Sequence, residues 1–158
     1  MHRIYVETSV ISYLANRPSR DGLVAARQAL THDWWAGLDK NEACLSALVI
    51  EEISRGDRQA AQNRLTIAQG LRQVDQTPEA ASLALRMIEA GLVPRTEPED
   101  ALHIALATVH QCRFLVSWNF AHFVGFEPRY RVASQLKAWG FAPAFLVTPE
   151  EIQFGEPL

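Results

Sequence analysis

The stretch Arg3-Ile4-Tyr5-Val6-Glu7-Thr8-Ser9-Val10-Ile11-Ser12-Tyr13-Leu14 decides the fold. Its first part, residues 3–7, is a short β-branched and aromatic run that is typical of a strand. Thr8 and Ser9 are suitable helix caps, and apolar residues then recur at helical spacing over residues 10–14. The stretch predicts a strand, a tight turn and a helix, with the acid Glu7 at the point where the strand ends.

Strand-like and helix-like segments alternate along the rest of the chain. Further strands are expected over residues 43–46, 71–75, 113–118 and 144–147, and helices over residues 21–35, 48–53, 57–68, 77–91, 101–109 and 130–139. The connections are short, and no internal repeat is present. The pattern predicts one α/β domain over residues 1–158, a three-layer α/β/α sandwich whose central parallel sheet is covered on both faces by helices.

The composition limits the class of protein. Of 158 residues, 48% are hydrophobic and 21% are charged, which is enough for one substantial core. No apolar run is long enough to span a membrane, and the first residues lack the pattern of a signal peptide, so a cytoplasmic protein is expected. Cys44 and Cys112 lack the spacing of a zinc site or a disulfide framework, so we expect two buried thiols.

Because the net charge is −3, the protein as a whole does not attract the phosphates of nucleic acid electrostatically. If RNA is the substrate, bound metal ions and local arginines must supply the attraction. Three arginine pairs are available, and each could equally be a pair of solvated surface residues: Arg17 with Arg20, Arg55 with Arg58, and Arg129 with Arg131.

Polar residues at the carboxyl ends of parallel strands are the place to look for a site. Glu7 and Asn119 each follow a predicted strand, Glu52 lies on the helix after the second strand, and Asp100 begins the helix before residues 113–118. Asp100 alone could equally be a helix cap. Clustered carboxylates repel one another, so a fold that gathers them needs a cation, and hard oxygen ligands favour Mg²⁺ or Mn²⁺. Hydrolysis of a phosphodiester bond is the natural chemistry for such a site.

Four segments resemble the motifs of PIN domains, and they occur in the family's order. YVETSVI at residues 5–11 is similar to the opening strand with its acid, and SALVIEEISRG at residues 46–56 is similar to the second motif. EDALHIALA at residues 99–107 and LVSWN at residues 115–119 match the third and fourth motifs. In the second motif, the register with the preceding serine selects Glu52 rather than Glu51.

The resemblance implies a PIN-like sandwich with endoribonuclease activity. It implies that Glu7, Asp100 and Asn119 hold Mg²⁺ or Mn²⁺, while Glu52 helps to place the metal and the attacking water. Small members of the family resemble VapC-type toxins, which implies a homodimer and a cognate antitoxin. Two residues depart from the usual motif, because Glu7 and Asn119 stand where the family usually has Asp, so activity or metal affinity could be reduced.

Other interpretations remain open. A catalytically silent PIN-like module that binds RNA or a protein is the main alternative, suggested by Glu7, Asn119 and the acidic net charge. A phosphatase with an aspartate nucleophile fits poorly, because it needs Asp at position 7 and an acid at position 9. His103 and His122 each lie three residues after a candidate ligand, and hydrogen-bonded structural roles are favoured for both.

Overall fold

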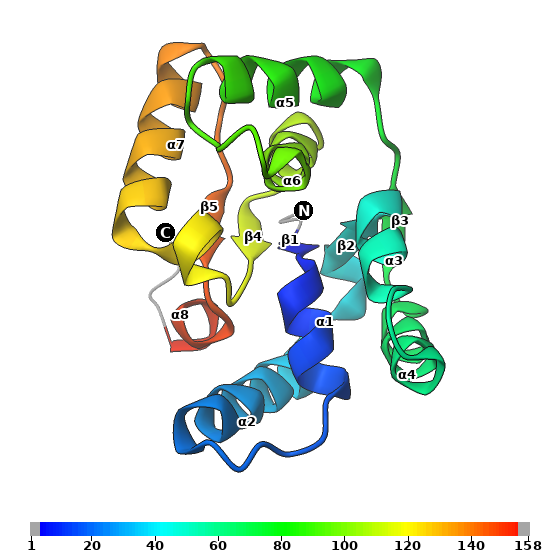
Figure 1. Ribbon diagram of the computed structural model, residues 1–158. Coiled ribbons are helices and arrows are strands. Elements are labelled where there is room, and N and C mark those ends of the chain that lie inside the picture. The colour runs from blue at the N-terminus through cyan, green and yellow to red at the C-terminus, as the bar shows by residue number, and fades with distance from the viewer. Residues whose placement is uncertain (1–3, 155–158) are drawn as a thin grey trace.

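A computed structural model describes residues 4–154 and shows a parallel sheet flanked by helices (Figure 1). The strands are β1 (Ile4–Val6), β2 (Ala43–Ser46), β3 (Arg72–Val74), β4 (Phe114–Val116) and β5 (Phe145–Val147). The helices are α1 (Thr8–Ala15), α2 (Gly22–Gly37), α3 (Ala47–Ile53), α4 (Arg58–Ala68), α5 (Pro78–Glu89), α6 (Pro98–Val109), α7 (Phe126–Ala138) and α8 (Pro149–Phe154). The predicted strand start at Arg3 and the predicted domain ends, residues 1–3 and 155–158, lie outside the described residues.

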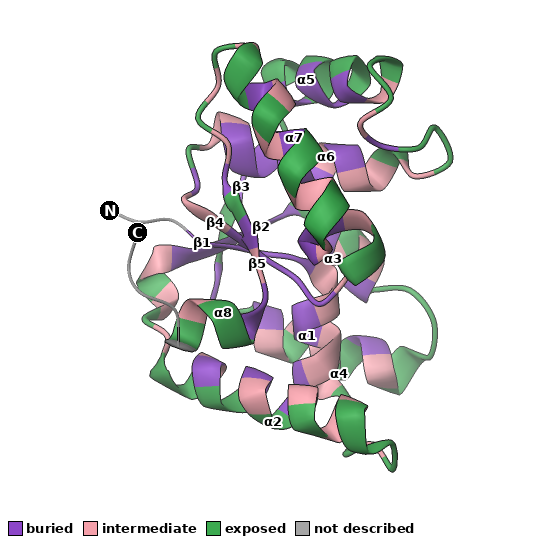
Figure 2. Cartoon of the chain, turned by 90° about the vertical axis from the view of Figure 1, so that its left-hand side faces the viewer, coloured by how far each residue is buried: buried purple, intermediate pink, exposed green. Residues whose placement is uncertain are grey.

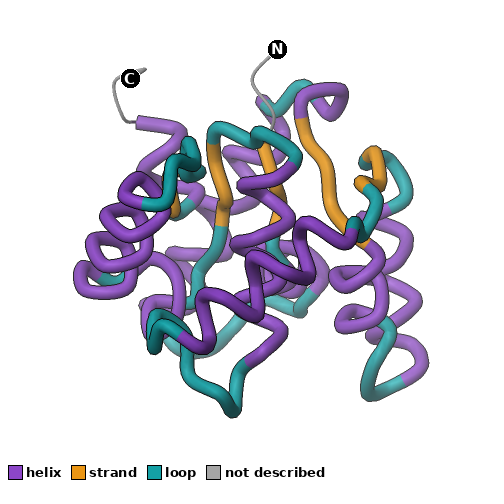
Figure 3. Tube along the Cα trace, turned by 90° about the horizontal axis from the view of Figure 1, so that it is seen from above, coloured by secondary structure: helices purple, strands orange, loops and turns teal. Residues whose placement is uncertain are grey.

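Helices cover both faces of the sheet, which confirms the predicted α/β architecture. Figure 2 shows the buried strands between a layer that contains α5, α6 and α7 and a layer that contains α1, α2, α4 and α8. Seen from above, the strands run side by side between these helices (Figure 3). All the strand pairs are parallel, so the carboxyl ends of the strands share one edge. Within residues 4–154, no helix is both long enough and apolar enough to cross a membrane.

The strand order places the candidate acids at one point of this edge. The order is β3-β2-β1-β4-β5. Strands β2 and β3 therefore lie on one side of β1, and β4 and β5 lie on its other side. In such sheets a crevice opens outside the carboxyl ends of the strands at the point of reversal. Here that point lies between β1, which leads into Glu7, and β4, which leads into Ser117 and Asn119.

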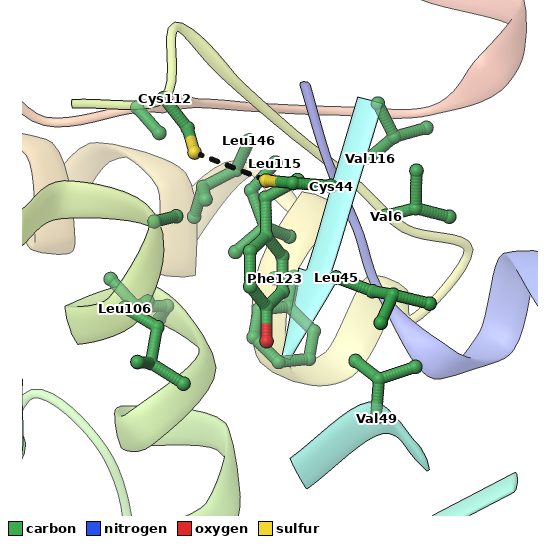
Figure 4. Packing of buried hydrophobic residues seen from close by; sticks show 14 of the residues in the cluster. Val6, Cys44, Leu45, Val49, Leu106, Cys112, Leu115, Val116, Phe123 and Leu146 are labelled. Atoms are coloured by element: carbon green, nitrogen blue, oxygen red, sulfur yellow. Dashed lines mark hydrogen bonds between the residues drawn. The ribbon is translucent and has the colours of Figure 1, made fainter. Parts of the chain in front are cut away.

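The core lies between the sheet and its helices. Every residue of β1 and β2 is buried, which suits strands that are covered on both faces. Figure 4 shows the strand residues Val6, Leu45 and Leu115 within this apolar cluster. The Sγ atoms of Cys44 and Cys112 lie 3.7 Å apart inside it, so the prediction of two buried thiols is confirmed.

Several element boundaries differ from the predicted ones. The N-cap of α1 is Glu7 and not Thr8 or Ser9, because its carboxylate accepts a hydrogen bond from the Ser9 backbone. Helix α6 begins at Pro98 rather than residue 101, since proline fits the first turn of a helix. Helix α7 begins at Phe126 rather than residue 130. Three short elements were not predicted at all: a 3₁₀ turn (Lys40–Glu42), a π-helical turn (Phe120–Val124) and α8.

Candidate functional site

Glu7 lies buried at the end of β1, and one of its two oxygens is fully engaged. Its Oε2 accepts hydrogen bonds from the Ser9 backbone N–H at 3.0 Å, from the Ser9 hydroxyl, and from the Ser117 hydroxyl at 2.9 Å. Among the described residues, no hydrogen bond reaches Oε1. The side chain therefore spans the gap between β1 and β4, with one carboxylate oxygen left for a ligand.

Glu52 shows the same division of its two oxygens. Its Oε1 accepts from the Thr8 hydroxyl at 2.9 Å and lies 2.5 Å from His103 Nε2. Its neighbour Glu51 is exposed and pairs with Arg55, so the helix turns Glu52 and not Glu51 toward Thr8 and His103. Burial acts to raise the pKa of Glu52, but the hydrogen bond and charge of His103, together with the Thr8 hydroxyl, outweigh it and lower the pKa below its ordinary 4.5.

Asp100 stands in the first turn of α6 and carries the least satisfied oxygen of the site. Its Oδ2 is buried and accepts no hydrogen bond from the described residues, although His122 Nδ1 lies 2.5 Å away. Ligand atoms of Glu97, Asp100 and His122 all lie within 4.8 Å of one another. A buried oxygen without a hydrogen bond is costly unless something binds it, so this group has the donor set and the spacing for a divalent cation.

Asn119 uses its side chain to begin the π-helical turn. Its Oδ1 accepts from the His122 backbone N–H at 3.1 Å, and its own backbone N–H donates to Ser117 Oγ at 2.9 Å. The amide therefore holds the turn that brings His122 to Asp100, while Ser117 links Asn119 to Glu7. A carbonyl oxygen has a second lone pair, so this cap does not prevent Oδ1 from meeting a metal.

Intermediate side chains connect the predicted residues at the carboxyl edge, but among the predicted acids only Asp100 belongs to the described group with metal-ligand spacing, which it forms with Glu97 and His122. Glu7 and Asn119 share Ser117, while Glu52 contacts Thr8, which directly follows Glu7. Asp100 is close enough to Glu7 for the charge of Glu7 to raise its pKa. The sequence did not predict a role for Glu97, and it favoured a hydrogen-bonded structural one for His122, yet ligand atoms of both residues lie within 4.8 Å of a ligand atom of Asp100.

Burial sets the protonation of Asp100. Desolvation raises the pKa of this carboxyl from its ordinary 3.8 to about 6; the charges of His122 and His103 oppose the shift, and those of Glu97 and Glu7 add to it. The Asp100 carboxyl keeps its proton to a higher pH in the folded protein than in the unfolded chain. Its contribution to the free energy of unfolding is therefore fully present below pH 3.8 and is lost as the pH rises through about 6. Ionised Asp100 is therefore a source of instability in the metal-free protein.

The variant Asp100→Asn is expected to be more stable than the wild type in EDTA at pH 7.5. The amide removes the buried charge, so the midpoint of thermal unfolding should rise by about 2–4 °C, which for a chain of this size is about 1 kcal/mol. The gain should shrink as the pH falls below 6 and vanish near pH 4, where Asp100 of the wild type is protonated in both states. Circular dichroism melts across this range measure it. An equal gain at every pH would contradict the assignment of the effect to Asp100 ionisation.

The comparison with known families decides the identity of the domain. The sequence profile described as the PIN domain matches residues 4–119, which is most of the chain. The chain belongs to the PIN-domain family. The matched region runs from β1 to Asn119 and contains all four residues that the resemblance selected. No curated protein matches the chain.

Two solved structures share the PIN fold with this chain. One is the Mycobacterium tuberculosis toxin VapC20, described as cleaving the sarcin-ricin loop, with a TM-score of 0.56 and 18% identity over 88% of this chain and 96% of that chain. The other is VapBC2 from Rickettsia felis bound to a DNA fragment from their promoter, with a TM-score of 0.51 and 16% identity over 75% of this chain and 89% of that chain. At these identities the likeness concerns the fold alone.

Proposed function

We propose that this PIN-domain protein is an endoribonuclease that hydrolyses RNA phosphodiester bonds with the help of Mg²⁺ or Mn²⁺. The observation that carries the proposal is the state of Asp100 Oδ2, which is buried beside Glu97 and His122 and accepts no hydrogen bond from the described residues. Glu7 and Glu52 each add a carboxylate oxygen to which no described hydrogen bond is made. Carboxylate oxygens in this state are ligands for a hard divalent cation.

Each residue has a distinct task in the proposed reaction. Asp100 and Glu7 would hold the metal, and the further available donors are Glu97 and His122, which lie within ligand spacing of Asp100, and the Asn119 carbonyl oxygen. A bound divalent cation supplies Lewis-acid stabilisation of the charge that develops on the phosphate and lowers the pKa of a coordinated water. Glu52, whose pKa is lowered, stays ionised near neutral pH and can accept a hydrogen bond from the attacking water at Oε2. Ser9 and Ser117 keep Glu7 in place.

Three of the six arginines expected to assist RNA binding are engaged by other groups of the protein. Of the arginine pairs expected to assist binding, Arg55 is engaged by Glu51 and Glu99, and Arg129 by Glu151. Arg131 donates to the Gly91 carbonyl. Arg17, Arg20 and Arg58 make no ion pair with the described residues, so these arginines and the bound metal would together attract the phosphates of RNA.

The partners follow from the likeness to VapC toxins and belong to the same proposal. We expect a homodimer and a cognate antitoxin protein that silences the enzyme; one solved structure with a similar fold is described as VapBC2 from Rickettsia felis. RNA and an antitoxin would both be met in the cytoplasm, where we place the protein.

Purified protein should cleave a structured RNA in the presence of Mn²⁺ or Mg²⁺ at about millimolar concentration, the range of weak metal sites. Cleavage should stop when EDTA is added in excess. Products resolved on a denaturing gel measure the reaction, and re-addition of Mn²⁺ should restore it. Persistence of the same cleavage in EDTA would reject the metal-dependent reaction. Calorimetric titration with no Mn²⁺ binding up to millimolar concentration would favour the alternative, a silent PIN-like module that binds RNA or a protein.

A further inference from the structure

A chain of buried hydrogen bonds runs from the interior of the sheet to Glu52. The Ser46 hydroxyl at the end of β2 lies 2.8 Å from the Tyr5 hydroxyl on β1, which lies 2.7 Å from His103 Nδ1 on α6. His103 Nε2 then lies 2.5 Å from Glu52 Oε1 on α3. Residues of β1, β2, α3 and α6 thus meet through one line of polar atoms, and Ser46, Tyr5 and His103 are almost fully buried.

The direction of the last hydrogen bond follows from the chemistry of its partners. A carboxylate has no hydrogen to give, so the short contact between His103 and Glu52 requires a hydrogen on Nε2 that is donated to Oε1. A neutral His103 then needs Nδ1 to accept from the Tyr5 hydroxyl, which can in turn accept from Ser46. The Tyr5 hydroxyl therefore supports the tautomer that donates to Glu52.

This arrangement fixes the orientation of the Glu52 carboxylate. Oε1 receives two hydrogen bonds, one from His103 and one from the Thr8 hydroxyl, and no described residue donates to Oε2. Resting on the proposed metal-dependent function, we infer that His103 is a positioning residue, braced by Tyr5 and Ser46, which holds Glu52 so that Oε2 is the oxygen available to the metal or to its water. Residues that hydrogen-bond a metal ligand without touching the metal typically change metal affinity or activity by about 10–100-fold.

The burial of these hydrogen-bonded side chains is a second reason to assign them a role beyond packing. Placing polar side chains in the core is unfavourable unless every hydrogen bond is made, and apolar residues of similar size would fill the same space without that requirement. Tyr5 and His103 also pack edge to face, with ring centroids 5.8 Å apart, and Phe123 contacts the imidazole in the same way at 6.2 Å. The imidazole is therefore held by two aromatic neighbours as well as through its two nitrogens.

Calorimetric titration of the full chain with Mn²⁺ tests the inference. In His103→Leu the dissociation constant for Mn²⁺ should rise by about 10–100-fold. His103→Gln, whose amide can still donate toward Glu52, should recover part of the affinity. Tyr5→Phe removes only the hydroxyl that supports the His103 tautomer, so its loss should be smaller than that of His103→Leu but measurable. Kinetics on an RNA oligonucleotide should show a fall in kcat with little change in KM, because Glu52 acts at the reacting centre.

Gln28→Leu is the control for a merely structural effect. Gln28 is a buried polar residue of α2 that bonds the backbone of Ser19 and Arg17, with no contact to the acids. Its replacement should lower the unfolding temperature and leave the Mn²⁺ affinity unchanged. The same behaviour in His103→Leu, with stability lost and affinity kept, would overturn the inference while leaving the proposed nuclease intact.

If His103→Leu does not fold, Tyr5→Phe decides the question. A Tyr5→Phe variant that binds Mn²⁺ as tightly as the wild type overturns the inference. A wild-type protein that binds no Mn²⁺ rejects the proposed function, and the inference with it.

Discussion

Replacing Asp100 with Asn is expected to lower the rate of RNA cleavage by about 1000-fold at saturating Mn²⁺, which corresponds to about 4 kcal/mol of lost transition-state stabilisation. The amide has almost the same shape as the carboxylate but no charge. Asp100 Oδ2 is the one buried side-chain oxygen or nitrogen of residues 4–154 that lacks a hydrogen bond, and its only described charged neighbour within ion-pair distance is His122. Single-turnover cleavage of an end-labelled RNA measures the loss.

The stability of the same variant provides its control. Asp100→Asn should melt at a higher temperature than the wild type when both are metal-free, because the buried charge is gone. Loss of cleavage in a protein that is more stable cannot be a folding defect. Cleavage within about threefold of the wild type, well inside the scale of a single catalytic contact, would remove Asp100 from the reaction.

Replacing Glu7 with Gln is expected to lower cleavage by about 100–1000-fold, the scale of losing one essential charged group of a catalytic site. Three donors converge on Glu7 Oε2, so the Gln carbonyl oxygen should occupy that position and leave the amide nitrogen where Oε1 stands. An amide nitrogen is a donor and cannot ligate a metal in place of the carboxylate oxygen. Weaker hydrogen bonds from Ser9 and Ser117 should also cost about 1 kcal/mol of stability.

Glu51→Gln is the matched control for this charge removal. Glu51 is exposed, and its one ion pair with the described residues is to the exposed Arg55, an interaction that contributes little in water. Its loss should change cleavage by less than about twofold, which is the effect of a surface ion pair of a few tenths of a kcal/mol. If Glu7→Gln behaved like Glu51→Gln, Glu7 would be only the cap of α1.

The sequence predicted the fold and the acids because each carries a local signal. Buried β-branched strands, helical spacing and caps such as Asp57 and Thr77 are properties of neighbouring residues, and both of these side chains cap the helix that follows them. Glu7 followed from its place after such a strand. Its capping role was missed because Ser and Thr are the usual caps and stand next to it.

The rest of the site depends on contacts that no local pattern encodes. His122 reaches Asp100 through a π-helical turn, whose spacing differs from that of the regular elements. Glu97 belongs to a proline-rich segment that reads as a loop, although Pro98 is also a signal for a helix start and could have placed α6 correctly. The order β3-β2-β1-β4-β5, which brings Ser117 to Glu7, is a property of long-range pairing and was not predicted.

The central claim is that acids from β1, α3 and α6 meet at the carboxyl edge of the sheet and hold a divalent cation. Anomalous scattering from crystals grown with Mn²⁺ tests it most directly. The expected result is a peak within about 2.5 Å of an oxygen of Asp100 and of an oxygen of Glu7 or Glu52, the range of metal–oxygen bonds to a hard cation. No peak there at millimolar Mn²⁺, or one confined to surface carboxylates elsewhere, would contradict it.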